Sequence, residues 1–365
     1  SGMATVYLGD TDSSYAMDRI TVYDLDLTSS AIGAAVELIA NSQCDGEIVL
    51  SSSSSALFTL TDVQLKAARH LILESGSLLR LDGDDSHSLF LHSSYGCCAG
   101  AGAGSLTVSA GSSVVSTGGA AIHYHGGDVS LDSTGTLNST QSSITISERC
   151  STNYSMAIGG STSPSDGNNY ALTLLRSELA RIQTKDLVLD SYSGSIFVSG
   201  LQQSTHLSGV LNGRLEVVAA TANTSWQFIV LDDGDTEFSD NSDGVLINGF
   251  AGISVHKNIS NRNSTLSFKF SSDDMLIAAP DVEITSSGPS GSIYFISSPA
   301  IYSGRLLVEH LPFSLTASHS TSDIAFSIGV VVNRSASSHR ELSVYVGNEL
   351  SFVAPSTGLS LQGDS

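Results

Sequence analysis

The sequence predicts an all-β protein, a parallel β-helix (β-solenoid) with loop insertions at its corners. Three observations support this fold: short segments alternate apolar with small polar residues, Gly and Ser occupy the corners between them, and one pattern returns along the chain with loops of variable length. Strands that are kept while loops change are typical of a solenoid, in which each repeat packs only on its neighbours. Antiparallel hairpins favour Asn-Gly turns instead, and a jelly-roll sandwich is the alternative for part of the chain.

The returning pattern occupies residues 172–200, 266–295 and 342–363. Each copy contains an alternating strand, a turn with an acidic-apolar step, an apolar run and a second alternating strand. A further strand begins at Gly194 and at Gly291, where a residue without Cβ suits a corner. We therefore expect three long repeats in a C-terminal solenoid that spans residues 156–365.

Shorter segments with the same pattern of strand and corner occupy residues 1–155. Three of them, each a strand, a corner and a second strand, begin at His70, Ser105 and Asp128. Their corner glycines are Gly76, Gly111 and Gly135. The unequal spacing of these glycines indicates an inserted loop, for which Cys97–Gly104 is the candidate.

The beginning of the chain predicts further strands. Alternating segments at residues 20–27 and 34–40 are early coils or a cap, whereas residues 62–72 fit a helix and a coil equally well. The N-terminal part, residues 1–155, and the C-terminal part form two solenoids or one continuous rod.

One segment carries a resemblance to a known family. The stretch ELARIQTKDLVLDSYSGSIFVSG resembles the strand repeats of filamentous-haemagglutinin-type secreted exoproteins, which are bacterial adhesins. The matching positions are Glu178, Leu179, Ile182, Leu187, Leu189, Gly194, Ile196 and Val198. The second copy replaces the Glu-Leu step by Asp274-Met275, and the third lacks the Gly-Ser-Ile strand. The resemblance implies a right-handed parallel β-helix in a surface fibre or adhesin, and it transfers no catalytic residue.

Charge narrows the range of functions. Charged residues make up 14% of the chain, below the roughly 25% of ordinary soluble domains, and the formal net charge is −21. Phosphate binding needs basic clusters, so nucleic acid and anionic membrane surfaces are disfavoured as partners. No apolar run reaches the ~18 residues of a membrane span. The acidic surface favours an extracellular or cell-surface location. Ser1–Met3 do not begin a secretory signal, so we expect either the remnant of an expression tag or a part of a longer chain.

Secretion would also account for the cysteines and the glycosylation motifs. Four cysteines permit two disulfides in three pairings, without the spacing of a zinc site: Cys44, Cys97, Cys98 and Cys150. Six Asn-x-Ser/Thr motifs offer candidate glycosylation sites: Asn138, Asn153, Asn223, Asn258, Asn263 and Asn333. We interpret the chain as a secreted protein on this basis.

Two segments could bind a metal ion. The acidic stretch 231–244 could supply the roughly six to eight oxygens that Ca²⁺ takes, and its candidate ligands are Asp232, Asp233, Asp235, Asp240 and Asp243. A solvated acidic loop is the alternative, and no other cofactor is expected. His123 and His125 would lie on one face of a strand beside Asp128, as metal ligands or as exposed coil positions.

We expect a non-catalytic structural or adhesive module of a surface fibre or adhesin. Its partners would be other copies or neighbouring modules of the fibre, and cell-surface glycans. The first alternative is a carbohydrate-active β-helix enzyme, a polysaccharide lyase or glycoside hydrolase, which needs carboxylates beside a basic residue. The second is a calcium-dependent glycan-binding module that uses residues 232–243.

Overall fold

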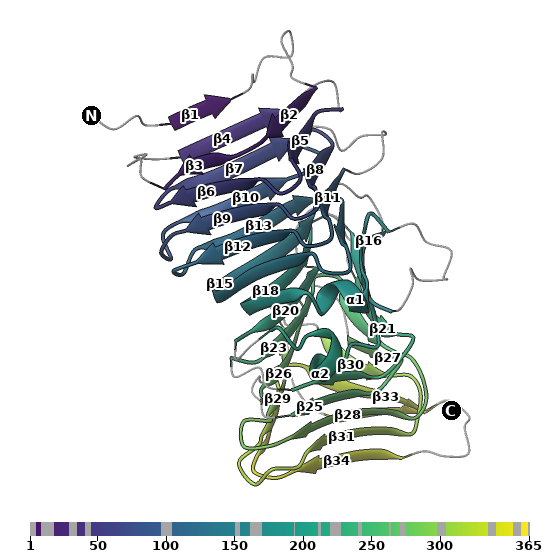
Figure 1. Cartoon of the computed structure of the whole chain (residues 1–365). Helices are drawn as coiled ribbons and strands as arrows, with labels where there is room; N and C mark the ends of the chain where they lie inside the picture. The colour runs from purple at the N-terminus through teal and green to yellow at the C-terminus, as the bar shows by residue number, and fades with distance from the viewer. Residues whose placement is uncertain are drawn as a thin grey trace. The chain divides into compact units, whose positions relative to one another are not determined.

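The structure is a computed structural model that describes residues 5–8, 18–28, 35–40, 45–95, 104–149, 154–160, 170–192, 194–210, 213–219, 228–239, 243–262, 264–270, 275–297, 304–334, 341–352 and 359–363. Regular structure in these residues is nearly all strand (Figure 1). The chain forms two compact units: residues 1–155, 169–190 and 209–211, and residues 156–168, 191–208 and 212–365. The sequence-based boundary at residue 155 separated two continuous halves, whereas residues 169–190 return to the first unit. Each unit is a parallel β-helix.

Three columns of parallel strands build the first unit. One column contains β2 (Arg19–Val22), β5 (Glu47–Leu50), β8 (His70–Leu73), β11 (Ser105–Val108) and β14 (Asp128–Leu131). The second contains β3 (Leu25–Leu27), β6 (Ser55–Thr59), β9 (Leu78–Asp82) and β12 (Ser113–Thr117). The third contains β1 (Thr5–Leu8), β4 (Ala35–Ala40), β7 (Asp62–Ala67), β10 (Ser88–His92) and β13 (Ala121–Gly126). The long strand β15 (Thr136–Glu148) continues the second and third columns. Two strands later in the chain, β17 (Leu172–Leu174) and β18 (Ile182–Ser191), complete the strands of this part of the chain.

Side chains inside the first unit lie in register from coil to coil. Ile48, Leu71, Leu106 and Val129 are Cα partners in successive strands, and none is more than 3% exposed. Their sequence numbers show that the middle coil is longer than its neighbours, so it carries the insertion. Alternation places every second residue in this column, because successive side chains of a strand point to opposite faces. The coils predicted in this part of the chain are confirmed.

Two of the predicted corner glycines have left-handed backbone angles, with φ of 76° at both Gly76 and Gly111. Gly135 is required for a different reason, because a Cβ atom there would lie 2.3 Å from the carbonyl oxygen of Val108. Residues 62–72, which fitted a helix or a coil, form strands β7 and β8.

The second unit has the same three-column plan. Its first column contains β16 (Tyr154–Gly159), β19 (Ser195–Ser199), β21 (Phe228–Asp232), β24 (Gly252–Val255), β27 (Met275–Ile277), β30 (Arg305–Val308), β33 (Gly329–Arg334) and β36 (Leu359–Gly363). The second contains β22 (Thr236–Phe238), β25 (Ile259–Arg262), β28 (Val282–Ser287), β31 (Phe313–Ala317) and β34 (Leu342–Val346). The third contains β20 (Leu215–Ala219), β23 (Val245–Gly249), β26 (Leu266–Phe270), β29 (Ile293–Ser297), β32 (Ile324–Phe326) and β35 (Leu350–Phe352).

The interior of the second unit contains a ladder of phenylalanines. Phe268, Phe295, Phe326 and Phe352 occupy equivalent positions in β26, β29, β32 and β35. Their ring centroids are 5.5, 4.8 and 5.3 Å apart, and the planes are nearly parallel. Stacked rings of this kind add roughly 0.5–1.5 kcal/mol per pair to the gain from burial.

The three long repeats are not equivalent coils, which corrects the prediction made from their sequences. Leu266 begins β26 in the third column of the second unit, whereas Leu342 begins β34 in the second column. The Gly-Ser-Ile strands also fall in different columns, as β19 and β29. Similar sequence segments recur in different columns, because every column requires an alternating strand followed by a corner of small residues.

In the described residues, two one-turn helices interrupt the strands, α1 (Arg176–Leu179) and α2 (Gln203–His206). The acidic-apolar step of the first repeat lies in α1, where Glu178 is 8% and Leu179 is 0% exposed. No helix in the described part of the chain is long and apolar enough to cross a membrane.

Candidate functional site

Outward-pointing side chains of β7, β10 and β13 bring ring-bearing and titratable residues together on one face of the first unit, and we call this group the histidine face. Lys66, His92 and His125 occupy one row of Cα partners. Phe90 and His123 occupy the adjacent row. The sequence drew attention to His123 and His125 but not to the other residues, because these come from earlier coils.

Contacts on the histidine face join the rings to each other. The rings of Phe90 and His123 stack with centroids 4.9 Å apart, and His92 meets His125 edge to face at 4.9 Å. Tyr95 adds an edge contact to His92 at 6.0 Å. Because the rings of Phe90 and His123 stack on each other, each ring covers one face of the other, and that face is not open to a ligand.

A partly buried ion pair lies beside these rings. Lys66 Nζ is 3.2 Å from Glu37 Oε1, and both side chains are only 14% exposed. The same Nζ lies 5.4 Å from the centroid of the Tyr95 ring, a cation–π geometry.

The three imidazoles of the histidine face are neutral at pH 7. Burial lowers the pKa of His92 to about 4 and that of His125 to about 3, with further lowering by the cationic Arg149. Burial also lowers the pKa of His123. Neutral imidazole can bind metals, yet among the residues that the structure describes no group of three His, Cys, Asp or Glu side chains is placed to hold an ion.

Asp128 does not join His123 and His125. Its carboxylate accepts a hydrogen bond from the backbone N–H of Thr173 at 3.0 Å, at the start of β14, and burial raises its pKa. The hydroxyl of the buried Tyr124 donates to the Asp128 carbonyl at 2.9 Å. The sequence motif therefore contributes to two places in the fold, because the chain turns a corner between β13 and β14.

A carboxylate and a guanidinium approach each other near the end of β15. Arg149 lies 3.9 Å from Asp190, and Ser147 donates a hydrogen bond to the same carboxylate at 3.2 Å. Burial raises the pKa of Asp190. Ser147 is the Cα partner of His125, so this pair lies one strand further along the row of the histidine face.

The acidic segment of the second unit holds its carboxylates in local contacts. Asp232 accepts from the backbone N–H of Asp233 at 2.7 Å, Asp233 accepts from Ser199 at 3.1 Å, and Asp235 accepts from the N–H of Asn258 at 3.2 Å. Asp240 lies outside the described residues, so the complete set of predicted calcium ligands stays a prediction. Asp243 lies at a different corner, before β23.

A groove of about 310 Å³ lies on the outer face of the second unit. Arg214 and Asp243 line it from the corners before β20 and β23, and Lys269 and Ile296 line it from β26 and β29. Arg214 also forms an ion pair with Glu216. The groove combines two cations, of which Arg214 is paired with Glu216, with the Asp243 carboxylate, hydroxyls and aliphatic side chains, a mixture that suits a polar ligand.

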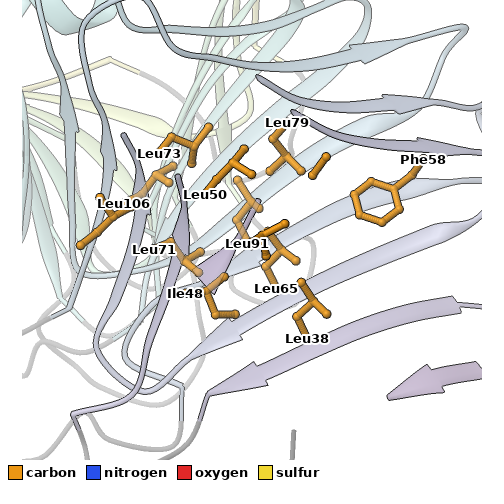
Figure 2. A pocket seen from close by; sticks show the side chains of 13 residues that line it. Leu38, Ile48, Leu50, Phe58, Leu65, Leu71, Leu73, Leu79, Leu91 and Leu106 are labelled. Carbon is orange, nitrogen blue, oxygen red and sulfur yellow. The ribbon is translucent and has the colours of Figure 1, made fainter. Parts of the chain in front are cut away.

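An apolar void inside the first unit is too small to hold a ligand. Figure 2 shows the leucine-rich lining, which includes Leu38, Leu50, Leu79 and Leu91, and the void measures about 20 Å³. That volume is close to the minimum of ~10–15 Å³ that one water requires, and water would also need polar partners. The void is therefore a packing gap inside the column.

The last coil of the second unit exposes side chains that are buried one coil earlier. Val344, Leu350 and Phe352 are 42%, 43% and 42% exposed. Their Cα partners in the preceding coil, Leu315, Ile324 and Phe326, are 1%, 0% and 3% exposed. The sequence does not mark this surface, because the strands of this coil have the same alternating pattern as those of the coils before it.

The predicted modification sites are only partly described. All four cysteines, together with Asn153, Asn223 and Asn263, lie outside the described residues. Asn138 donates to Gln183 at 3.2 Å, and Asn258 accepts from the backbone N–H of Glu283 at 2.8 Å. Asn333 is in β33. Glycosylation and disulfide formation stay predictions.

Comparison with known proteins assigns no family to this architecture. No protein-family model, no curated protein and no solved structure matches the chain.

Proposed function

We propose that this chain is an extracellular structural and adhesive module of a surface fibre or adhesin. The observation that carries the proposal is the continuous stacking of coils within each unit around a filled apolar column. Such a column makes every coil depend on its neighbours, so the units resist local opening and keep their outer faces in fixed positions. A stiff support with variable outer side chains is what a fibre module requires.

Composition supports the extracellular part of the proposal. The net charge of −21 and the low content of charged residues suit a surface of small hydroxyl side chains. Such strands keep high β-propensity with few long flexible side chains. The resemblance to filamentous-haemagglutinin-type repeats points to the same location.

The groove beside Arg214 and Lys269 supports the adhesive part. Glycans of cell surfaces offer hydroxyls and carboxylates, and a lysine, a guanidinium and the hydroxyl of Ser267 can pair with these groups. Leu246 and Ile296 add aliphatic surface for the sugar ring. A cell-surface glycan is the partner that we assign to this groove.

A glycan array with a paired activity assay tests the proposal. We expect binding to acidic glycans, weakened by Arg214→Ala with Lys269→Ala and retained by Lys185→Ala, which removes a lysine from the other unit. We also expect no change in the chain length of polysaccharides incubated with the protein. Release of shortened or unsaturated saccharides would overturn the proposal.

One observation favours the alternative, a carbohydrate-active enzyme. Asp190 has a raised pKa and lies 3.9 Å from Arg149, which places one carboxylate of the kind that sugar cleavage uses as an acid beside a basic residue. If polysaccharide is cleaved, Asp190→Asn should abolish the cleavage while leaving the thermal stability close to that of the wild type. A variant that still cleaves would remove Asp190 from the reaction.

A further inference from the structure

The outer face of the first column in the first unit aligns polar residues of successive coils in one row. Arg19, Glu47 and His70 are Cα partners in β2, β5 and β8, and Ser105 and Asp128 are Cα partners in β11 and β14. Ser105 lies opposite His70, because the residues that follow them in the two strands are Cα partners. Neighbouring strands are about 4.8 Å apart, so the row places a carboxylate, an imidazole, a hydroxyl and a second carboxylate side by side.

Two hydrogen bonds join His70 to Ser105. The backbone N–H of Ser105 donates to His70 Nδ1 at 3.2 Å, and the Ser105 hydroxyl oxygen lies 3.0 Å from the same nitrogen. A ring nitrogen that accepts from an N–H carries no proton itself, so the ring proton is on Nε2 and the hydroxyl donates to Nδ1. The imidazole is therefore placed to take the proton of Ser105 Oγ, as a general base does for a nucleophilic serine.

The surroundings of this pair keep the imidazole unprotonated at pH 7. Burial lowers the pKa of His70 and the charge of Arg69 lowers it further, while the carboxylates of Glu47 and Asp45 act in the opposite direction. The net shift is downward from the ~6.5 of an ordinary histidine. His70 and Ser105 are both partly exposed, so a molecule in solution can reach the hydroxyl.

We propose that Ser105 is a nucleophile activated by His70 and that this pair hydrolyses small, uncharged acyl esters. Ser105 Oγ attacks the ester carbonyl carbon while its proton passes to His70 Nδ1. The bond from that carbon to the alcohol oxygen then breaks, and the alcohol leaves with the proton. Water attacks the acyl-serine and gives one proton to Nδ1, the carboxylic acid departs, and the proton returns to Oγ. This activity goes beyond the proposed function and uses residues of the first unit, whereas the glycan groove lies in the second.

Neighbouring side chains favour an uncharged acyl group. Glu47 and Asp128 flank the pair in the row, and neither offers a positive partner to an anionic acyl group. The guanidinium of Arg69 is already paired with the Asp45 carboxylate at 2.8 Å.

A partly apolar surface lies beside the hydroxyl. Ile72 and Thr107 are Cα partners two residues further along the strands of His70 and Ser105, on the same face, and both are partly exposed. Their methyl groups offer apolar contact to a short acyl chain.

Diisopropyl fluorophosphate tests the nucleophile directly, because an activated serine displaces fluoride from its phosphorus. We expect the label on Ser105 when peptides of the wild type are mapped by mass spectrometry. His70→Gln is the decisive variant: its amide oxygen can still accept the Ser105 N–H, but it cannot take a proton. Labelling of His70→Gln should be at least about a hundredfold slower. Ser113→Ala is the matched control, since it removes the hydroxyl of the first residue of β12 and should be labelled like the wild type.

Nitrophenyl esters measure turnover and the preferred acyl group. The acetyl ester should be hydrolysed at least tenfold faster than the anionic succinyl ester, and Ser105→Ala should hydrolyse neither above the rate in buffer. The wild-type rate should fall only when the pH drops below the ~6.5 of an ordinary histidine, because protonation of His70 removes the base. Mapping the label on the wild type needs no substitution, so the assignment is tested even if a variant has a lower melting temperature.

Three results would overturn this proposal. They are a wild type that is not labelled, a label on another serine such as Ser254, which contacts His256 at 2.9 Å in the second unit, and a His70→Gln variant labelled as fast as the wild type. Ester hydrolysis leaves the chain length of a polysaccharide unchanged. The glycan array and the polysaccharide assay therefore decide the proposed function separately from the reactivity of Ser105.

Discussion

Glu178 accepts a hydrogen bond from the backbone N–H of Leu131, a residue of the preceding coil, at 3.2 Å. Its other carboxylate oxygen accepts from the N–H of Leu175 at 2.9 Å. The carbonyl of Leu131 in turn accepts from the guanidinium of Arg181. Glu178 of the short helix α1 and Arg181, which follows the helix, therefore supply side-chain partners to the end of β14.

Replacing Glu178 by Ala should destabilise the first unit by about 2–4 kcal/mol, because one buried and one partly buried backbone N–H group lose their acceptors. Glu178→Gln should cost less, since the amide oxygen can still accept one of the two hydrogen bonds. Urea unfolding monitored by circular dichroism measures both. Glu283→Gln changes an exposed carboxylate of the second unit and should have little effect. Equal stability of wild type and Glu178→Ala would show that these hydrogen bonds contribute nothing.

The histidine face should make the protein sensitive to acid. The folded-state pKa values of His92 and His125, about 4 and about 3, lie below the ~6.5 of an unfolded histidine. The folded state therefore binds fewer protons, and stability is lost as the pH falls from ~6.5 towards the folded values. Lys66 faces His92, and Arg149 faces both His92 and His125; the positive charges of these two residues oppose protonation of the imidazoles.

Melting temperatures between pH 7.5 and pH 4 measure this effect. We expect the curve of a His92→Gln, His125→Gln variant to fall less steeply than that of the wild type. Buried acids whose pKa is raised, such as Glu178, act in the opposite direction, because their stabilisation is present at low pH and is lost as pH rises through the folded value. Parallel curves for the two proteins would remove the histidines from the acid response.

The phenylalanine ladder should show how much a covering coil adds. Phe295 is 0% exposed between two other rings, so Phe295→Ala should cost about 3–5 kcal/mol through lost burial and a residual cavity. Phe352 is stacked on one side only, and Phe352→Ala should cost less than half as much. Chemical denaturation of dilute protein gives both values. Equal losses would mean that Phe352 is already covered in solution.

Gly135 should not tolerate a side chain. A Cβ atom would lie 2.3 Å from the carbonyl oxygen of Val108, so Gly135→Ala must displace the backbone of the preceding coil. A cost of about 1–3 kcal/mol is expected for such overpacking. Gly329→Ala is the control, because the nearest atom to its Cβ, in Arg305, is 3.8 Å away. Thermal unfolding compares the two, and a stable Gly135→Ala protein would contradict the close approach.

Local pattern was sufficient to predict strands, corners and the coil spacing of the first unit. Alternation in a segment such as Ser105–Val108 needs no distant partner to be recognised, and Gly76 and Gly111 mark corners through their own backbone preference. The same local origin explains the error in the long repeats. A segment such as Gly-Ser-Ile indicates a strand and its corner, but it does not specify the column in which the strand lies.

By itself the sequence determined the class of fold, because the period-two alternation and the small-residue corners are properties of neighbouring residues. Tertiary structure decided which coils lie next to each other, and thereby brought His92 beside His125 and left Phe352 half uncovered. The physical reason is that loop insertions change the number of residues per coil without changing the strands. Contacts between coils therefore depend on registers that only the assembled backbone fixes.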